Sequence, residues 1–167
     1  MTGNSEFVRA RLLRVLGHGF WIEQDEASAA ARAILEIQAM SFYIAKTVQG
    51  SFDATVEKVI AALKEEGFGV LTDIDVSSTL KTKLGIDWRP YRILGACNPQ
   101  LAHLALQTED KIGVMLPCNV ILQELANSEV EVATIDPTAS MERVGKPALS
   151  ELAETVRNKL SAVLARL

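Results

Sequence analysis

Two strand-like segments near the C-terminal end are separated by only three residues, and this spacing limits the folds open to the chain. Residues 119–125 and 129–136 both have strand character, and the triplet "ANS" between them is a turn. Within "EVEVATID", at 129–136, apolar and polar residues alternate, which is typical of a strand with one exposed face. Strands joined by so short a turn pair antiparallel, since parallel strands need a long crossover. The chain therefore contains an antiparallel sheet.

Earlier in the chain, strand-like segments alternate with helix-like ones. Strands are predicted at 41–49, 68–74, 91–97 and 112–117, the last either separate from 119–125 or joined to it across a proline. Helices are predicted at 51–67, 75–85, 98–107 and 147–167. The stretch 135–145 is predicted to be an irregular link. The order from residue 42 is β-α-β-α-β-α-β-β-β-α, which favours an α+β fold over a doubly wound parallel sheet.

The first forty residues have a different composition. Amphipathic helices are predicted at 6–17 and 25–40, and they form an N-terminal helical extension at 1–40 ahead of a single α+β domain at 41–167. Met40 can itself serve as a translation start, so the sequence leaves open whether translation begins at Met1 or Met40.

Composition excludes several classes of protein. The hydrophobic share of 49% and the charged share of 23% exclude a disordered chain. A net charge of −4 provides no basic field for nucleic acid. The sequence contains no apolar run of about 18 residues, which a membrane-spanning helix would need. Two cysteines in 167 residues suit a reducing cytosol. We therefore expect a cytoplasmic protein with no nucleic-acid or membrane partner.

The common signatures of catalysis and of cofactor binding are absent. The chain has no G-x-x-x-x-G-K-[ST], no strand followed by G-x-G-x-x-G, no C-x-x-C, no H-E-x-x-H and no G-x-S-x-G. Its two histidines cannot supply a histidine-rich metal site. These patterns predict no cofactor, no resident metal and no identified catalytic residue. They favour a non-enzymatic protein, although a site assembled from scattered residues stays open.

The segment "GACNPQ" is the first place where chemistry can reside. Asn98 followed by proline matches the start of a helix, which puts Cys97 at a helix N-terminus where a thiolate can be stabilised. His103 lies on the same predicted helix, about a turn and a half further on. The alternative is a buried structural cysteine beside a capping asparagine, and we favour it because cysteine is among the most buried residue types.

The segment "LPCN" is the second such place. Cys118 follows a proline inside an apolar stretch, and a proline there implies a strand edge, a strand start or a bulge. If the predicted strands at 91–97 and 112–117 are neighbours in the sheet, both cysteines come to one end of it, and the two thiols can form a reversible disulfide or part of a soft-metal site. Asn98 and Asn119 have amides that can orient a ligand, although capping and turn roles are the structural alternatives. The candidate site is Cys97, Asn98, His103, Cys118 and Asn119.

Three stretches, "EEGFGVLTDIDV", "YRILGACNPQLAHLAL" and "GVMLPCNVILQEL", together resemble the family known as domain of unknown function 302. The resemblance covers about residues 42–167, and the first 39 residues depart from it. It implies a two-layer α+β fold in which helices back a curved, mainly antiparallel sheet, similar to the TATA-box-binding-protein architecture. It also implies self-association, but it supplies no activity, cofactor or catalytic residue.

Two hypotheses for the function follow. The first is a non-enzymatic, homo-oligomeric module that binds a small molecule or a protein partner between sheet and helices. The second is a thiol-based redox, sulfur-carrier or soft-metal-binding protein that uses Cys97 and Cys118. Nucleic-acid binding would rest on fold analogy alone, which is a weak argument. We favour the binding module.

Overall fold

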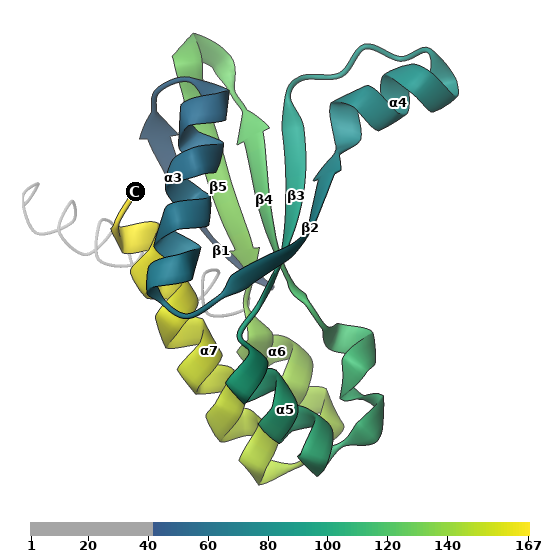
Figure 1. Cartoon of the computed structure of the whole chain (residues 1–167), viewed down its shortest axis with the longest axis vertical. Coiled ribbons are helices and arrows are strands. Elements are labelled where there is room, and N and C mark those ends of the chain that lie inside the picture. The colour runs from purple at the N-terminus through teal and green to yellow at the C-terminus, as the bar shows by residue number, and fades with distance from the viewer. Residues whose placement is uncertain (1–41) are drawn as a thin grey trace, which may run out of the picture. The chain divides into compact units, whose positions relative to one another are not determined.

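A single five-stranded antiparallel sheet organises the chain, in the strand order β1-β5-β4-β3-β2 (Figure 1). The computed structural model describes residues 42–167. The helices predicted at 6–17 and 25–40, and with them the helical extension, lie outside the described residues. The strands are β1 Tyr43–Gln49, β2 Gly69–Asp75, β3 Tyr91–Cys97, β4 Cys118–Glu124 and β5 Glu129–Ile135.

Residues 42–167 also contain five α-helices and three short 3₁₀ helices, of which α6, η3 and α7 follow the last strand. The α-helices are α3 Phe52–Glu65, α4 Val76–Leu84, α5 Pro99–Thr108, α6 Pro137–Met141 and α7 Pro147–Ala165. The 3₁₀ helices are η1 Asp110–Met115, η2 Ala126–Ser128 and η3 Glu142–Val144. None of the helices in the described part of the chain has the length and apolar character needed to cross a bilayer.

The main core lies between one face of the sheet and helices α3 and α7, which lie side by side over it (Figure 1). Apolar residues recur at three- and four-residue steps along α7, so they share one face of the helix. The fully buried Leu160 of α7 packs in the same cluster as Leu63 of α3 and Leu122 of β4. Burying each such leucine stabilises the fold by about 1.5–3 kcal/mol. The α+β fold with a helix-backed antiparallel sheet is therefore confirmed.

A smaller core joins α5, η1, α6 and α7. Its buried members are Ala105, Ile112, Met141, Leu149 and Ala153. This cluster explains the one strand prediction that is wrong. The segment 112–117 is not a strand, because Ile112 is buried in the smaller core as part of η1 and because β4 already occupies the place beside β3.

The segment predicted as an irregular link, 135–145, contains α6 and η3 instead. Asp136 caps α6, because its side chain accepts a hydrogen bond from the backbone N–H of Thr138. Met141 is buried at the end of α6 and belongs to the smaller core. The tertiary contact made by Met141 and the cap made by Asp136 together order this stretch.

Candidate functional site

The two cysteines lie on neighbouring strands of the sheet. Cys97 is the last residue of β3, and Cys118 is the first residue of β4. In the β3–β4 ladder Ala96 is the direct partner of Cys118, so Cys97 lies one position beyond it. A cis peptide bond between Leu116 and Pro117 precedes Cys118. The two cysteines do meet at one end of the sheet, but through the pairing of β3 with β4 and not through a strand at 112–117, which is a 3₁₀ helix over most of its length.

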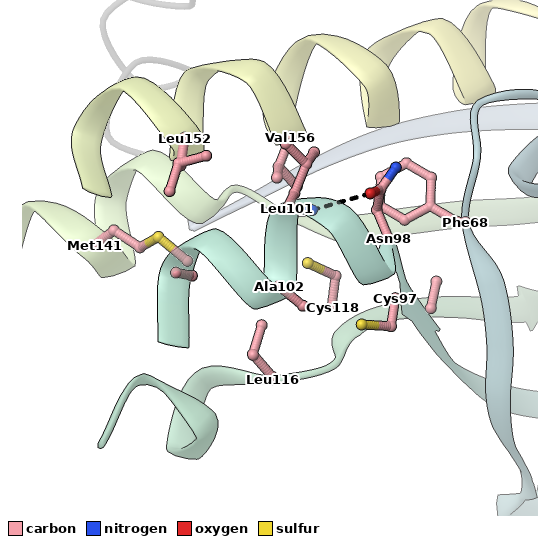
Figure 2. Close-up of a pocket in the computed structure, with 12 residues that line it drawn as sticks. Phe68, Cys97, Asn98, Leu101, Ala102, Leu116, Cys118, Met141, Leu152 and Val156 are labelled. Carbon is pink, nitrogen blue, oxygen red and sulfur yellow. Dashed lines mark hydrogen bonds between the residues drawn. The ribbon is translucent and has the colours of Figure 1, made fainter. Parts of the chain in front are cut away.

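Both cysteines line one small cavity beneath α5 (Figure 2). Its volume is about 30 Å³, and a buried water needs about 10–15 Å³ on the same measure. The cavity walls are almost entirely apolar. Its lining residues are Phe68, Ala96, Cys97, Asn98, Leu101, Ala102, Ala105, Leu116, Cys118, Met141, Leu152 and Val156. A space of this size is far below the roughly 300–1,000 Å³ of small-molecule sites.

Burial of the thiols opposes thiolate formation at both positions. It raises the pKa of Cys97 above its ordinary value. Burial, with a smaller contribution from a charge on Cys97, raises the pKa of Cys118 to about 11. Reactive cysteines instead have lowered pKa values in electropositive, partly exposed surroundings. The geometry therefore agrees with the structural interpretation of the two cysteines.

Of the three other predicted site residues, Asn98 lines the cavity, whereas His103 and Asn119 do not. Asn98 is buried, and its Oδ1 accepts a hydrogen bond from the backbone N–H of Leu101 at 3.2 Å, which confirms its capping role (Figure 2). His103 is exposed on α5 and does not line the cavity. Asn119 is exposed and alternates with the buried Cys118, so it belongs to the opposite face of the sheet. The structure thus brings Cys97, Asn98 and Cys118 together, without His103 and Asn119.

No group of three or more metal-ligating side chains occurs between residues 42 and 167. The two thiols share their cavity with an asparagine and apolar side chains only. A zinc site ordinarily needs four ligands, or three and a water molecule.

A second candidate site lies on the sheet face turned away from α3 and α7, here called the open face. One row of directly paired residues crosses this face through all five strands. The row, here called the apolar row, is Ile74, Ile93, Ile121, Ala133 and Ala45. No helix in the described part of the chain covers this row, although antiparallel sheets usually present polar side chains to water on such a face.

The open face is hollowed beside this row, forming what we call the open-face concavity. Its volume is about 440 Å³, within the range of small-molecule sites. It is lined by Phe42, Tyr43, Tyr91, Asn119, Ile121, Gln123, Glu131, Ala133, Thr134 and Ile135. The rings of Phe42 and Tyr43 meet edge to face, with their centroids 5.0 Å apart. Aromatic and aliphatic groups therefore provide most of the binding surface.

A chain of hydrogen bonds fixes the polar side of this concavity. Arg89 donates to Oε1 of Gln123, and Nε2 of Gln123 donates to the carboxylate of Glu131 on the next strand. Because each group holds the next, Gln123 and Glu131 are positioned before any ligand arrives, which lowers the entropic cost of binding. A carboxylate and amide groups beside an apolar floor suit a flat apolar molecule that carries hydrogen-bond donors.

Sequence analysis did not single out Tyr91, Ile121, Gln123 or Glu131. The signal for them is alternation, because every second residue of β4 and of β5 points away from the helices. Alternation identifies an outward face. It does not show that outward residues on different strands gather around one concavity, because this depends on strand order and register.

The comparisons with known proteins agree with this fold. The family model described as "Domain of unknown function DUF302" matches residues 44–167. Among solved structures, the crystal structure of an uncharacterised conserved protein of this family from Bacillus stearothermophilus is 33% identical, with a TM-score of 0.70. The match covers 75% of this chain and 97% of that one. No curated protein matches the chain. The resemblance seen in the sequence is confirmed, and the chain belongs to the domain of unknown function 302 family.

Proposed function

We propose that this protein is a non-enzymatic, homo-oligomeric binding module whose ligand is a small, largely apolar molecule held in the open-face concavity. The observation that carries this proposal is the concavity of about 440 Å³ with its aromatic and aliphatic lining. The other cavity, beneath α5, has about 30 Å³ and is too small for such a ligand. The binding surface is therefore the face away from the helices, and not the space between sheet and helices that sequence analysis favoured.

The chemical class of the ligand follows from the rim. Glu131 offers a carboxylate, and Asn119 and Gln123 offer amides. Burying an aromatic ring against Tyr91 and Ile121 supplies most of the free energy of binding, and the polar groups orient the ring. A neutral or cationic aromatic ligand with an N–H donor fits this arrangement, whereas an anionic ligand would meet the charge of Glu131.

Three further parts of the proposal rest on sequence. They are the division into a helical extension at 1–40 and a domain at 41–167, self-association, and a cytoplasmic location. The last is supported by Cys97 and Cys118, which are both free thiols, as a reducing cytosol would keep them.

The test uses N-phenyl-1-naphthylamine, a neutral aromatic amine whose fluorescence rises in apolar surroundings. We expect saturable binding by the full chain, and we expect Tyr91→Ala to weaken it about 5- to 30-fold, because the variant removes one aromatic wall. Two control variants change exposed apolar side chains that do not line the concavity. Val114→Ser lies on η1 and Leu104→Ser lies on α5, and both should bind the probe as the wild type does.

Thermal melting of each variant accompanies the titration, so that loss of binding is separated from loss of folding. The proposal fails if the wild type does not bind the probe. It also fails if Tyr91→Ala binds as tightly as the wild type, because the probe then occupies another surface.

The second candidate function is a redox pair formed by Cys97 and Cys118. One observation favours it, namely that both thiols line the same small cavity on adjacent strands. In that function a hydroperoxide would oxidise the two thiols to one disulfide. Its O–O bond would break, and its two oxygens would take up the two thiol hydrogens and leave as one water molecule and one alcohol, or as two water molecules when the oxidant is hydrogen peroxide. The raised pKa of both thiols opposes it, because the thiolate is the reacting form.

Alkylation rates measured by mass spectrometry from pH 6 to 11 decide between these views. From the pKa directions we expect slow reaction of both cysteines at neutral pH. Cys97 should react before Cys118, because Cys97 is half-buried and Cys118 is buried. The midpoint for Cys118 should lie near 11. A midpoint below about 8.5 for Cys97, or a Cys97–Cys118 disulfide after mild peroxide treatment, would favour the redox function instead.

A further inference from the structure

Residues 69–90 form a projecting segment, here called the arm, which comprises β2, α4 and the connection to β3. In Figure 1 α4 lies beyond the end of β2, away from α3 and α7. No residue of α4 is buried, and six of the seven residues of β2 are exposed. Val70 alone packs against the main core, and the rest of the arm is held by its own short-range contacts and by the pairing of β2 with β3.

The exposure of α4 needs a physical explanation. The helix has 9 residues, and isolated helices shorter than about 12–15 residues are marginal in water. Asp75 caps its start, since its Oδ1 accepts from the backbone N–H of Ser78 at 2.8 Å, and Gly85 ends it in the left-handed conformation. Two good caps contribute about 1–2 kcal/mol in all. Most helical stability in proteins comes from packing, and α4 contacts β3 but buries none of its residues within the described part of the chain.

The arm carries an unusual number of large apolar side chains in contact with water. Their exposed fractions are 67% for Leu71, 47% for Ile74, 65% for Leu84, 46% for Ile86 and 49% for Trp88. With full side-chain areas of about 150–250 Å², these fractions amount to about 500 Å² of apolar surface. The sum is comparable with the roughly 300–600 Å² of apolar surface in the largest patch on a typical monomer.

The area matches what a stable dimer requires. A standard interface buries about 800 Å² on each partner, and somewhat more than half of it is apolar, which is about 450–500 Å². The arm of one copy supplies this amount by itself. Two arms related by a two-fold axis would cover each other, because an isologous interface uses the same patch on both subunits.

The charges of the arm also permit two copies to approach. Nζ of Lys81 lies 2.6 Å from Oδ1 of Asp87, so these opposite charges offset each other within one arm. Asp73 is held by the guanidinium of Arg92 on β3. The guanidinium of Arg89 lies over the ring of Trp88, at 5.3 Å from its centroid. A second arm therefore meets apolar groups flanked by internally paired charges.

We propose that two copies of this chain associate through their arms, with Leu84, Ile86 and Trp88 at the centre of the interface. This proposal deepens the homo-oligomeric part of the proposed function and rests on it. Tryptophan at the centre is consistent with interfaces in general, where it is among the residues that contribute most to binding. In the dimer α4 gains the burial that it lacks in one copy.

The experiment measures the mass of the full chain by sedimentation velocity from 1 to 200 µM. We expect a dimer for the wild type, and a dimer dissociation constant raised at least about 10-fold in Leu84→Glu and in Trp88→Glu, because each places a charge in an apolar interface. The matched control is Leu104→Glu on α5. Leu104 is 47% exposed, close to the 49% of Trp88, and it lies outside the arm.

Hydrogen exchange of the α4 amides provides a second measurement. The wild type at high concentration should protect these amides, and Trp88→Glu should expose them while amides of α7 keep their protection. A circular dichroism spectrum equal to that of the wild type shows that each variant is folded.

Three results would overturn the proposal. They are a monomeric wild type throughout the range, arm variants that remain dimers, and a control that dissociates as the arm variants do. The second and third would leave self-association standing but move the interface elsewhere. Binding of the naphthylamine probe is measured on the open-face concavity, so failure of the dimer and failure of the ligand site are distinguished.

Discussion

At the scale of single residues, Asp136 shows how one carboxylate connects three elements. It follows β5, caps α6 and contacts α7. Its Oδ1 accepts from the N–H and the Oγ1–H of Thr138, at 3.0 and 2.6 Å, and its Oδ2 accepts from Nε of Arg157 at 2.7 Å. Burial alone would raise the pKa of Asp136, but these hydrogen bonds and the charge of Arg157 outweigh it, so the pKa lies below its usual range.

Replacing Asp136 by alanine should therefore lower the free energy of unfolding at pH 7 by about 2–3 kcal/mol, because a cap and a charge-assisted bond are lost together. The effect depends on pH. Since the folded-state pKa is lowered, the stabilisation is complete above the unfolded value of 3.8 and is lost as pH falls through the lower folded value. Urea unfolding at pH 7, 5 and 3 tests this.

Asp110→Asn is the control for that experiment. Asp110 pairs with Lys111, and both side chains are largely exposed, so the variant should change stability by less than about 1 kcal/mol. An equal loss in both variants, or a loss in Asp136→Ala that stays the same at pH 3, would contradict the role given to Asp136.

At the scale of elements, the neighbourhood of β3 shows where local rules suffice and where they do not. Asn98 and Pro99 start α5 as predicted, because capping depends on residues adjacent in sequence. The proline at position 117 also marks the start of β4, as the sequence suggested. The segment before it is a 3₁₀ helix because Ile112 contacts residues distant in sequence, which no local pattern records.

Gly95 of β3 gives a prediction at this scale. A Cβ atom there would lie 2.8 Å from Cγ of Pro117, which immediately precedes β4, and closer still to Oγ1 of Thr72 on β2. We expect Gly95→Ala to destabilise the protein by about 1–3 kcal/mol through overpacking, measured as the urea midpoint. Gly113→Ala, whose Cβ would meet nothing within 4 Å, should have little effect.

The added variant Thr72→Ala should recover part of the stability lost in Gly95→Ala, because it removes the nearer of the two obstructing atoms. No recovery, or a loss in Gly113→Ala as large as that in Gly95→Ala, would show that crowding is not the cause.

At the scale of the whole described region, the two faces of the sheet differ, and the proposed function depends on this difference. Helices α3 and α7 cover one face, and the main core forms there. The open face and the arm contribute little to that core, yet both present apolar groups to water. Because the core does not depend on these groups, they are available for a ligand and for a second copy. Variants at Tyr91 should then change ligand binding, and variants at Leu84 or Trp88 should change self-association, more than they change the free energy of unfolding.

Sequence alone predicted much of the fold. Apart from 112–117, each predicted strand and helix within residues 42–167 is present, and the caps at Asp75, Asn98 and Gly85 occur where expected. The candidate site was harder to predict. The meeting of Cys97 and Cys118 was expected only through a strand at 112–117, whereas β4 is the strand that pairs with β3. The open-face concavity was not foreseen, because its lining comes from four separate stretches of chain.

The sequence by itself determined most of the elements and the α+β class, because periodicity, caps and turns act between residues close in the chain. The family followed from the resemblance of three stretches of the sequence to that family, which its family model confirms. Only the tertiary structure decided that 112–117 is not a strand, that one thiol is buried and the other half-buried, and that Tyr91, Ile121 and Glu131 gather on one face of the sheet. These features depend on strand order and on contacts between distant residues. A side chain's exposure and its pKa are set by what packs against it, and no local pattern specifies that partner.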